Sequence, residues 1–138
     1  MDEKRYKAMI HDEICTYDVC KLAKEKGFPQ HIGDDAYVVE NEYDDKYEVG
    51  CCYSIQFIPD YLPTITAPTQ SLLQRWLREE KGIIIELKYS DDTESFRPFW
   101  SWQIYNTLGI TLEIGEPNTT YELALEDALK YALESLVI

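Results

Sequence analysis

Residues 66–89 decide the fold, and they read TAPTQSLLQRWLREEKGIIIELKY. Apolar side chains recur in the first half at the spacing of one helix face, at Leu72, Leu73, Trp76 and Leu77. Pro68 suits the first turn of a helix, and either Thr66 or Thr69 can supply the capping oxygen. Gly82 is placed to end the helix in a left-handed conformation. The stretch therefore predicts a capped helix with one buried face.

The second half of this stretch predicts a strand. Three isoleucines begin it, and charged and apolar side chains then alternate up to Tyr89. β-branched residues followed by alternation are typical of an inner strand. We therefore expect residues 83–89 to form a strand that packs against the preceding helix.

Length and charge limit the classes of function. The chain has 138 residues, and we expect residues 1–138 to form one domain with one core. It carries 13 basic and 26 acidic residues, a net charge of −13, which disfavours binding to nucleic acid or anionic lipid. No apolar run has the length of a membrane span or follows the first residues as in an export signal, so we expect a cytoplasmic protein.

The N-terminal half is predicted to contain a short helix and two strands. Asp18 is a plausible cap for the helix, and Gly27 is placed to stop it. Strand alternation is clear from Val49 to Phe57. The predicted elements are a helix over residues 17–26, strands over 36–39 and 49–57 joined by a turn at 41–45, and a loop over 60–67.

The C-terminal half is predicted to contain an antiparallel meander and a helix. Residues 99–105 alternate, a turn at 106–109 places Gly109 at positive φ, and Ile110, Leu112 and Ile114 alternate beyond it. Thr119 and Glu122 have the spacing of a capping box. An apolar stripe follows at Tyr121, Leu125, Ala128, Leu129, Ala132 and Leu136.

Together these elements predict an α+β fold in the order α-β-β-α-β-β-β-α. A mainly antiparallel sheet of about five strands packs against two amphipathic helices, and a short N-terminal helix completes the fold. Trp100 and Trp102 share a strand face and are expected to form a core layer under Trp76 or the last helix. The opposite face carries the better candidates for a partner surface: Phe99, Gln103 and Tyr105.

Candidate chemistry rests on scattered residues. The histidines and cysteines are His11, His31, Cys15, Cys20, Cys51 and Cys52, and no pair has the short spacing that zinc sites use. A Cys–His nucleophile pair is an enzymatic alternative without a local signature. The acidic groups Asp34-Asp35, Asp44-Asp45 and Asp91-Asp92 with Glu94 lack the order of a calcium loop. We therefore assign no catalytic, cofactor-binding or metal-binding residue.

Two segments resemble small uncharacterised proteins of phages, prophages and mobile elements of gut anaerobes. One is the motif from Ala67 to Glu79 continued by Gly82 to Glu86, and the other is the closing segment, residues 120–133. The resemblance implies a shared fold and a phage or prophage origin, and it brings no activity or site residues. The order helix, three strands, helix also resembles double-stranded-RNA-binding domains and some antitoxins. The acidic start of the last helix argues against RNA binding.

Our first functional hypothesis is a non-catalytic, intracellular accessory protein of phage or mobile-element type that acts by protein–protein contact. One version of it is a DNA mimic, whose carboxylates occupy the phosphate sites of a nucleic-acid enzyme. The alternative is a small metal- or cysteine-dependent hydrolase that uses His11, His31 and the cysteines. A third hypothesis is a homo-oligomer formed through the Tyr105 face or an exposed edge strand.

Overall fold

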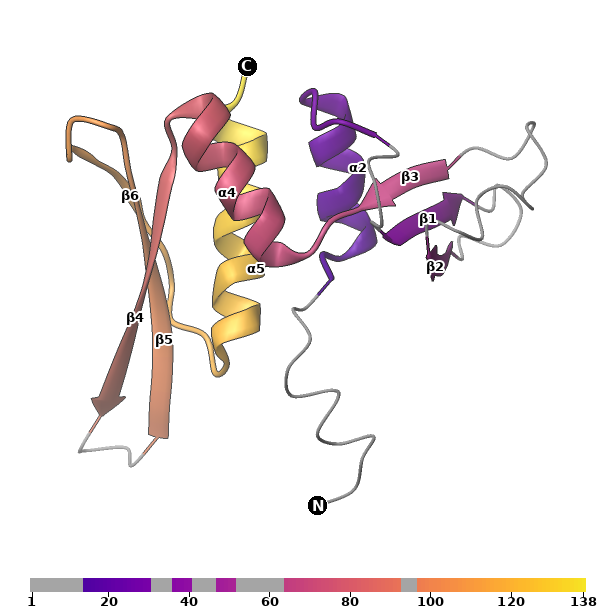
Figure 1. The fold of residues 1–138 in the computed structure, drawn as a ribbon. Helices are drawn as coiled ribbons and strands as arrows, with labels where there is room; N and C mark the ends of the chain where they lie inside the picture. The colour runs from indigo at the N-terminus through magenta and orange to yellow at the C-terminus, as the bar shows by residue number, and fades with distance from the viewer. Residues whose placement is uncertain (1–13, 31–35, 41–46, 52–63, 93–96) are drawn as a thin grey trace.

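The computed structural model describes residues 14–30, 36–40, 47–51, 64–92 and 97–138, and it has an α+β fold (Figure 1). Its helices are α2 (Tyr17–Glu25), α4 (Gln70–Lys81) and α5 (Tyr121–Tyr131), which continues as the π-helical turn η1 (Ala132–Leu136). Its strands are β1 (Ala36–Glu40), β2 (Tyr47–Cys51), β3 (Thr64–Ala67), β4 (Ile84–Asp92), β5 (Arg97–Tyr105) and β6 (Thr111–Ile114). None of the helices in this described part has both the length and the apolar character that a bilayer crossing requires.

The strands form two antiparallel sheets of three strands, in the orders β2-β1-β3 and β4-β5-β6. Figure 1 shows α4 and α5 between them, with α2 beside β3. The prediction of a single sheet of about five strands was therefore wrong. The prediction of a loop over residues 60–67 was wrong for residues 64–67, which form β3. Ile65, Thr66 and Ala67 are buried, and the strand pairs with β1. Prolines on both sides of this short β-branched segment gave it the composition of a loop.

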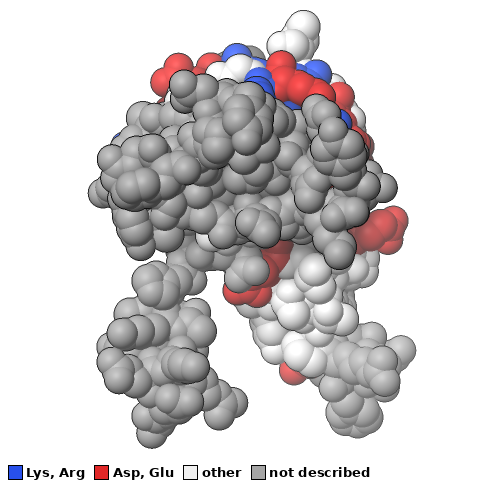
Figure 2. Space-filling view, turned by 90° about the vertical axis from the view of Figure 1, so that its right-hand side faces the viewer, with Lys and Arg blue, Asp and Glu red and all other residues white. Residues whose placement is uncertain are grey.

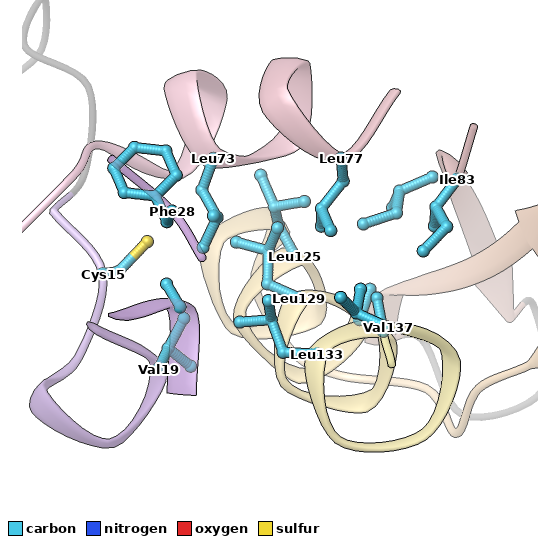
Figure 3. Close-up of a cluster of buried hydrophobic side chains, with 14 of the residues drawn as sticks. Cys15, Val19, Phe28, Leu73, Leu77, Ile83, Leu125, Leu129, Leu133 and Val137 are labelled. Atoms are coloured by element: carbon cyan, nitrogen blue, oxygen red, sulfur yellow. The ribbon is translucent and has the colours of Figure 1, made fainter. Parts of the chain in front are cut away.

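One hydrophobic core joins α2, α4, α5, η1, β3 and the helix-facing side of β4 and β5 (Figure 3). Leu73 and Leu77 of α4 are fully buried, as the helical spacing predicted, while Trp76 lies at the margin of the core. Trp76 meets Phe28 edge-on, with ring centroids 5.4 Å apart. Trp102 is 3% exposed and lies under the last helix, so this tryptophan is part of the core layer as expected.

The helix ends differ from the predictions in three places. The cap of α4 is Thr69, which accepts a hydrogen bond from the amide of Leu72, so Pro68 precedes the helix and does not lie in its first turn. The cap of α5 is Thr120 and not Thr119. At α2 the N-cap position is Thr16, without a side-chain cap, and the predicted cap Asp18 lies in the first turn. Each error is one or two residues, the ordinary uncertainty of helix boundaries.

The predicted meander is confirmed, but its last strand has an unexpected phase. Glu113 pairs with Ile104 and Ile114 pairs with Gln103, and the register shifts between Ile104 and Tyr105. Side chains of paired residues lie on the same face of a sheet. Glu113 therefore faces the helices, while Ile114 lies on the opposite face and is 60% exposed. Gly109 has the positive φ, 79°, that the turn before β6 required.

Candidate functional site

The outward side of α5 carries three adjacent hollows that share lining residues, and we call them together the acidic groove. The first, about 360 Å³, lies between the end of β6 and α5; the second, about 310 Å³, lies between the start of α2 and α5; the third, about 280 Å³, lies between α2 and η1. Lys130 lines all three hollows. The acidic lining residues are Asp18, Glu25, Glu113, Glu116, Glu126, Asp127 and Glu134, and the basic ones are Lys21 and Lys130.

Two carboxylates in the first hollow are fixed by aromatic donors. The indole Nε1 of Trp102 donates a hydrogen bond to Oδ2 of Asp127 at 2.9 Å, and the hydroxyl of Tyr131 donates to Oε2 of Glu113 at 2.8 Å. The two rings are 5.5 Å apart between centroids. The bond to Glu113, followed by burial, raises the pKa of Tyr131, so the hydroxyl keeps its proton and remains a donor. The two carboxylates therefore have defined positions.

Gly115 allows the chain to cross directly over Trp102. Its amide donates to the carbonyl oxygen of Trp102 at 2.9 Å. A Cβ atom at this position would lie 1.8 Å from Cε2 of the Trp102 ring. Only glycine fits such an approach without displacement of the ring. The close contact fixes the indole and, through it, the carboxylate of Asp127.

Glu126 in the second hollow has a structural task. Its Oε1 accepts a hydrogen bond from the amide of Thr16 at 2.6 Å, and its Oε2 accepts one from Nε2 of Gln70 at 2.8 Å. The same Nε2 donates to the carbonyl oxygen of Glu122 at 2.8 Å. Gln70 is 4% exposed, although it is polar, and its two bonds join α4 to α5. Glu126, in the middle of α5, thus binds the N-cap residue of α2 and the first residue of α4.

Other carboxylates of the groove are free to meet a ligand. Within the described ranges, the side chains of Asp18, Glu116 and Glu134 make no hydrogen bond or salt bridge, and neither does the ammonium of Lys130. Seven carboxylates face two lysines around the three hollows, and this excess attracts cationic groups. Among the residues that the structure describes, no three His, Cys, Asp or Glu side chains converge as ligands of a metal ion.

Acidic and basic side chains are distributed unevenly on another side of the molecule as well. Figure 2 shows them next to one another along the upper rim, whereas the lower described part shows acidic side chains beside uncharged ones. Exposed charges of opposite sign largely cancel each other in water. A surface that lacks basic neighbours keeps its attraction for cations.

The sequence-predicted chemical residues do not assemble into a site in the described part of the chain. Cys15 and Cys20 are free, buried thiols in the core, and Sγ of Cys20 donates to the carbonyl oxygen of Cys15 at 3.5 Å. Burial, with a smaller effect of Glu126, raises the pKa of Cys20 to about 12 and that of Cys15 further. Both thiols stay protonated at neutral pH, so neither serves as the nucleophile of a cysteine hydrolase.

The other candidates lie partly outside the described residues. His11, His31, Cys52, Asp34, Asp35, Asp44, Asp45 and Glu94 belong to the undescribed ranges, as does the predicted turn at 41–45. Cys51 ends β2, where its backbone pairs with Ala36. Asp91 and Asp92 are the last residues of β4.

The predicted partner face of the sheet is open on the side away from α4 and α5. Phe99, Gln103 and Tyr105 lie there and are half-buried. The hydroxyl of Tyr105 donates to Oε1 of Gln103, and burial together with the charge of Glu86 raises the pKa of Tyr105. The hydroxyl of Tyr105 is thus held on the sheet by Gln103.

Comparison of the chain with protein-family models, curated proteins and solved structures found no match.

Proposed function

We propose that this protein is a non-catalytic binding protein whose acidic groove holds a basic segment of another protein. The observation that carries this proposal is the groove itself: seven carboxylates against two lysines around three adjacent hollows on one side of α5. Two of these carboxylates are fixed before any partner arrives, because Trp102 and Tyr131 hold them. Fixed acceptors lose little conformational entropy when a cation binds.

The chemistry of the groove favours arginine and lysine side chains as its ligands. A guanidinium group can bind a carboxylate through two parallel hydrogen bonds, and charged hydrogen bonds are about twice as strong as neutral ones. Three hollows in a row offer places for several such side chains of one segment. The net charge of −13 repels a phosphate backbone, which supports a protein partner over a nucleic acid.

DNA mimicry is a narrower version of the same proposal, in which the basic segment belongs to a nucleic-acid enzyme. The acidic composition and the groove support it equally. The segments that resemble phage proteins support a phage or mobile-element origin, and the free thiols of Cys15 and Cys20 support a reducing, intracellular setting.

A peptide-binding experiment tests the proposal. The probe is an oligo-arginine peptide of nine residues, compared with a glycine–serine peptide of equal length at several salt concentrations. Glu116 and Glu134 line the groove without a structural task, so Glu116→Gln with Glu134→Gln removes two charges from it. Glu80→Gln with Asp91→Asn removes the same charge from exposed positions elsewhere.

We expect the arginine peptide to bind and the neutral peptide not to bind. The groove variant should weaken binding about fivefold, from roughly 0.5 kcal/mol for each exposed charge pair. The control variant should change it less than twofold. Equal weakening by both variants would show attraction by net charge alone and would contradict the proposed site.

A further inference from the structure

Among the residues that the structure describes, strand β4 forms a free edge of the β4-β5-β6 sheet. All nine of its residues pair with β5 on one side. On the other side, no strand of the described part of the chain pairs with it. Figure 1 shows the far half of β4 extending beyond α4. Such an edge presents unpaired amide and carbonyl groups that can pair with a further strand.

The hydrogen bonds of β5 show which residues of β4 direct their backbone groups to this edge. Trp100 and Trp102 use theirs on the β6 side, because Trp100 exchanges two 2.7 Å bonds with Asn118 and the carbonyl of Trp102 accepts from Gly115. Their partners in β4 are Tyr89 and Leu87. In an antiparallel ladder, such partners direct their own N–H and C=O groups outward. The free edge therefore presents the backbone of Leu87 and Tyr89.

The side chain of Gln74 marks where the open stretch begins. Its Nε2 donates to the carbonyl oxygen of Ile85 at 3.0 Å. Ile85 has the same phase as Leu87, so its carbonyl group also points to the free edge. A carbonyl oxygen has two lone pairs and can accept a second bond from an added strand.

The charges of β4 are complementary to those of a second β4. Glu86 and Lys88 flank Leu87, and both are exposed. If two copies pair antiparallel about a twofold axis at Leu87, each Glu86 lies opposite Lys88 of the other copy. A shift of the axis by one residue places Lys88 opposite Lys88, or Glu86 opposite Glu86. Like charges directly opposite one another destabilise a strand pair, so the charges select one register.

We propose that two copies of this chain form a dimer through β4, with Leu87 at the twofold axis. The outward backbone groups of Leu87 then pair with those of the other copy, and Tyr89 lies opposite Ile85. The β4-β5-β6 sheets of the two copies then become one continuous sheet of six strands, with the helices of both copies on one face. Residues of β4 line none of the hollows of the acidic groove, so the dimer is independent of the proposed function.

Charge reversal tests both the dimer and its register. The mass of the full chain is measured by light scattering during size-exclusion chromatography and by sedimentation over a range of concentrations. The wild type should change from a monomer of 16.2 kDa to twice that mass as concentration rises. Lys88→Glu and Glu86→Lys should each weaken the dimer roughly tenfold or more, because two attractive pairs become repulsive. The double variant Glu86→Lys with Lys88→Glu should restore it.

Two control variants distinguish an effect at the edge of β4 from an effect of net charge on the dimer. Arg78→Glu and Glu80→Lys make comparable charge changes on the exposed side of α4, and they should leave the dimer within about twofold. Circular dichroism confirms that each variant is folded. A wild type that stays monomeric at every concentration would overturn the proposal. So would a dimer whose affinity is unchanged by the charge reversals, or one that the double variant does not restore.

Discussion

The two sides of α5 show how one helix serves as both scaffold and binding surface. On the inner side, Leu125 and Leu129 are almost completely buried against α4 and the sheet. On the outer side, Asp127 and Lys130 line the acidic groove. The inner side is closely packed and tolerates little change, whereas the outer side holds polar groups that water already solvates. The packing of the inner side fixes the positions of the groove residues.

The largest expected effect is on the inner side. Leu129→Ala should lower the free energy of unfolding by about 2–5 kcal/mol, because Leu129 is fully buried and the variant leaves a cavity. Urea unfolding followed by circular dichroism measures this loss. Leu123 is the matched control on the same helix, since it is 53% exposed. Leu123→Ala should cost less than about 1 kcal/mol, and equal costs for the two variants would contradict the assignment of the sides.

The next largest effect on stability is expected at Gly115, which lines the first hollow and lies against Trp102. Gly115→Ala should lower the free energy of unfolding by about 1–3 kcal/mol, because the new Cβ has to displace the Trp102 ring. The near-ultraviolet circular dichroism of the tryptophans should change with it. In a protein that already carries Trp102→Leu, Gly115→Ala should lower the free energy of unfolding by less than it does in the wild type. An unchanged spectrum in Gly115→Ala would show that the ring is not held where the structure places it.

A smaller effect is expected at the start of α5. Thr120→Ala removes the oxygen that caps the amide of Leu123 and should cost about 1 kcal/mol. Thr119→Ala changes the neighbouring residue, which makes no capping bond, and should cost close to nothing. Thermal unfolding of both variants measures the difference. The reverse order would favour the capping box that the sequence suggested.

The smallest effect concerns the outer side at high pH. Tyr131 has a pKa above its ordinary value of 10.0 because it donates to Glu113. The folded state therefore holds this proton more tightly than the unfolded state. Its contribution to stability is present below the unfolded pKa and is lost as the pH rises through the folded pKa. NMR titration of Tyr131 should show a lower pKa in Glu113→Gln than in the wild type, and an identical pKa would exclude the bond.

Much of the fold could be predicted from the sequence because local signals agreed with the tertiary structure. The helix of Leu73 and Leu77 and the strands of the meander have clear periodicity, and Gly82 ends the helix at a φ of 66° as expected. β3 was missed because four residues between prolines give no periodic signal. Its burial depends on α2 and β1, which a local pattern does not contain.

The groove could not be predicted, for a physical reason that centres on β6. Strand alternation placed Glu113 on the side opposite to the apolar residues, and such positions usually face water. The register shift beside Tyr105 instead directs Glu113 toward Tyr131. Asp127 was one of several charges outside the apolar stripe of α5, and nothing in the sequence indicates its bond to Trp102. Contacts between distant residues create this site.

The indole signal of Trp102 reports directly on whether a ligand enters the acidic groove. Its N–H donates to Asp127 inside the groove, whereas Trp76 lies across the core beside Phe28 and serves as an internal reference. In a two-dimensional ¹⁵N–¹H NMR titration with the oligo-arginine peptide, we expect the Trp102 signal to shift until saturation while that of Trp76 stays in place. A Trp102 signal that does not move, or that moves no more than that of Trp76, would contradict a binding groove along α5.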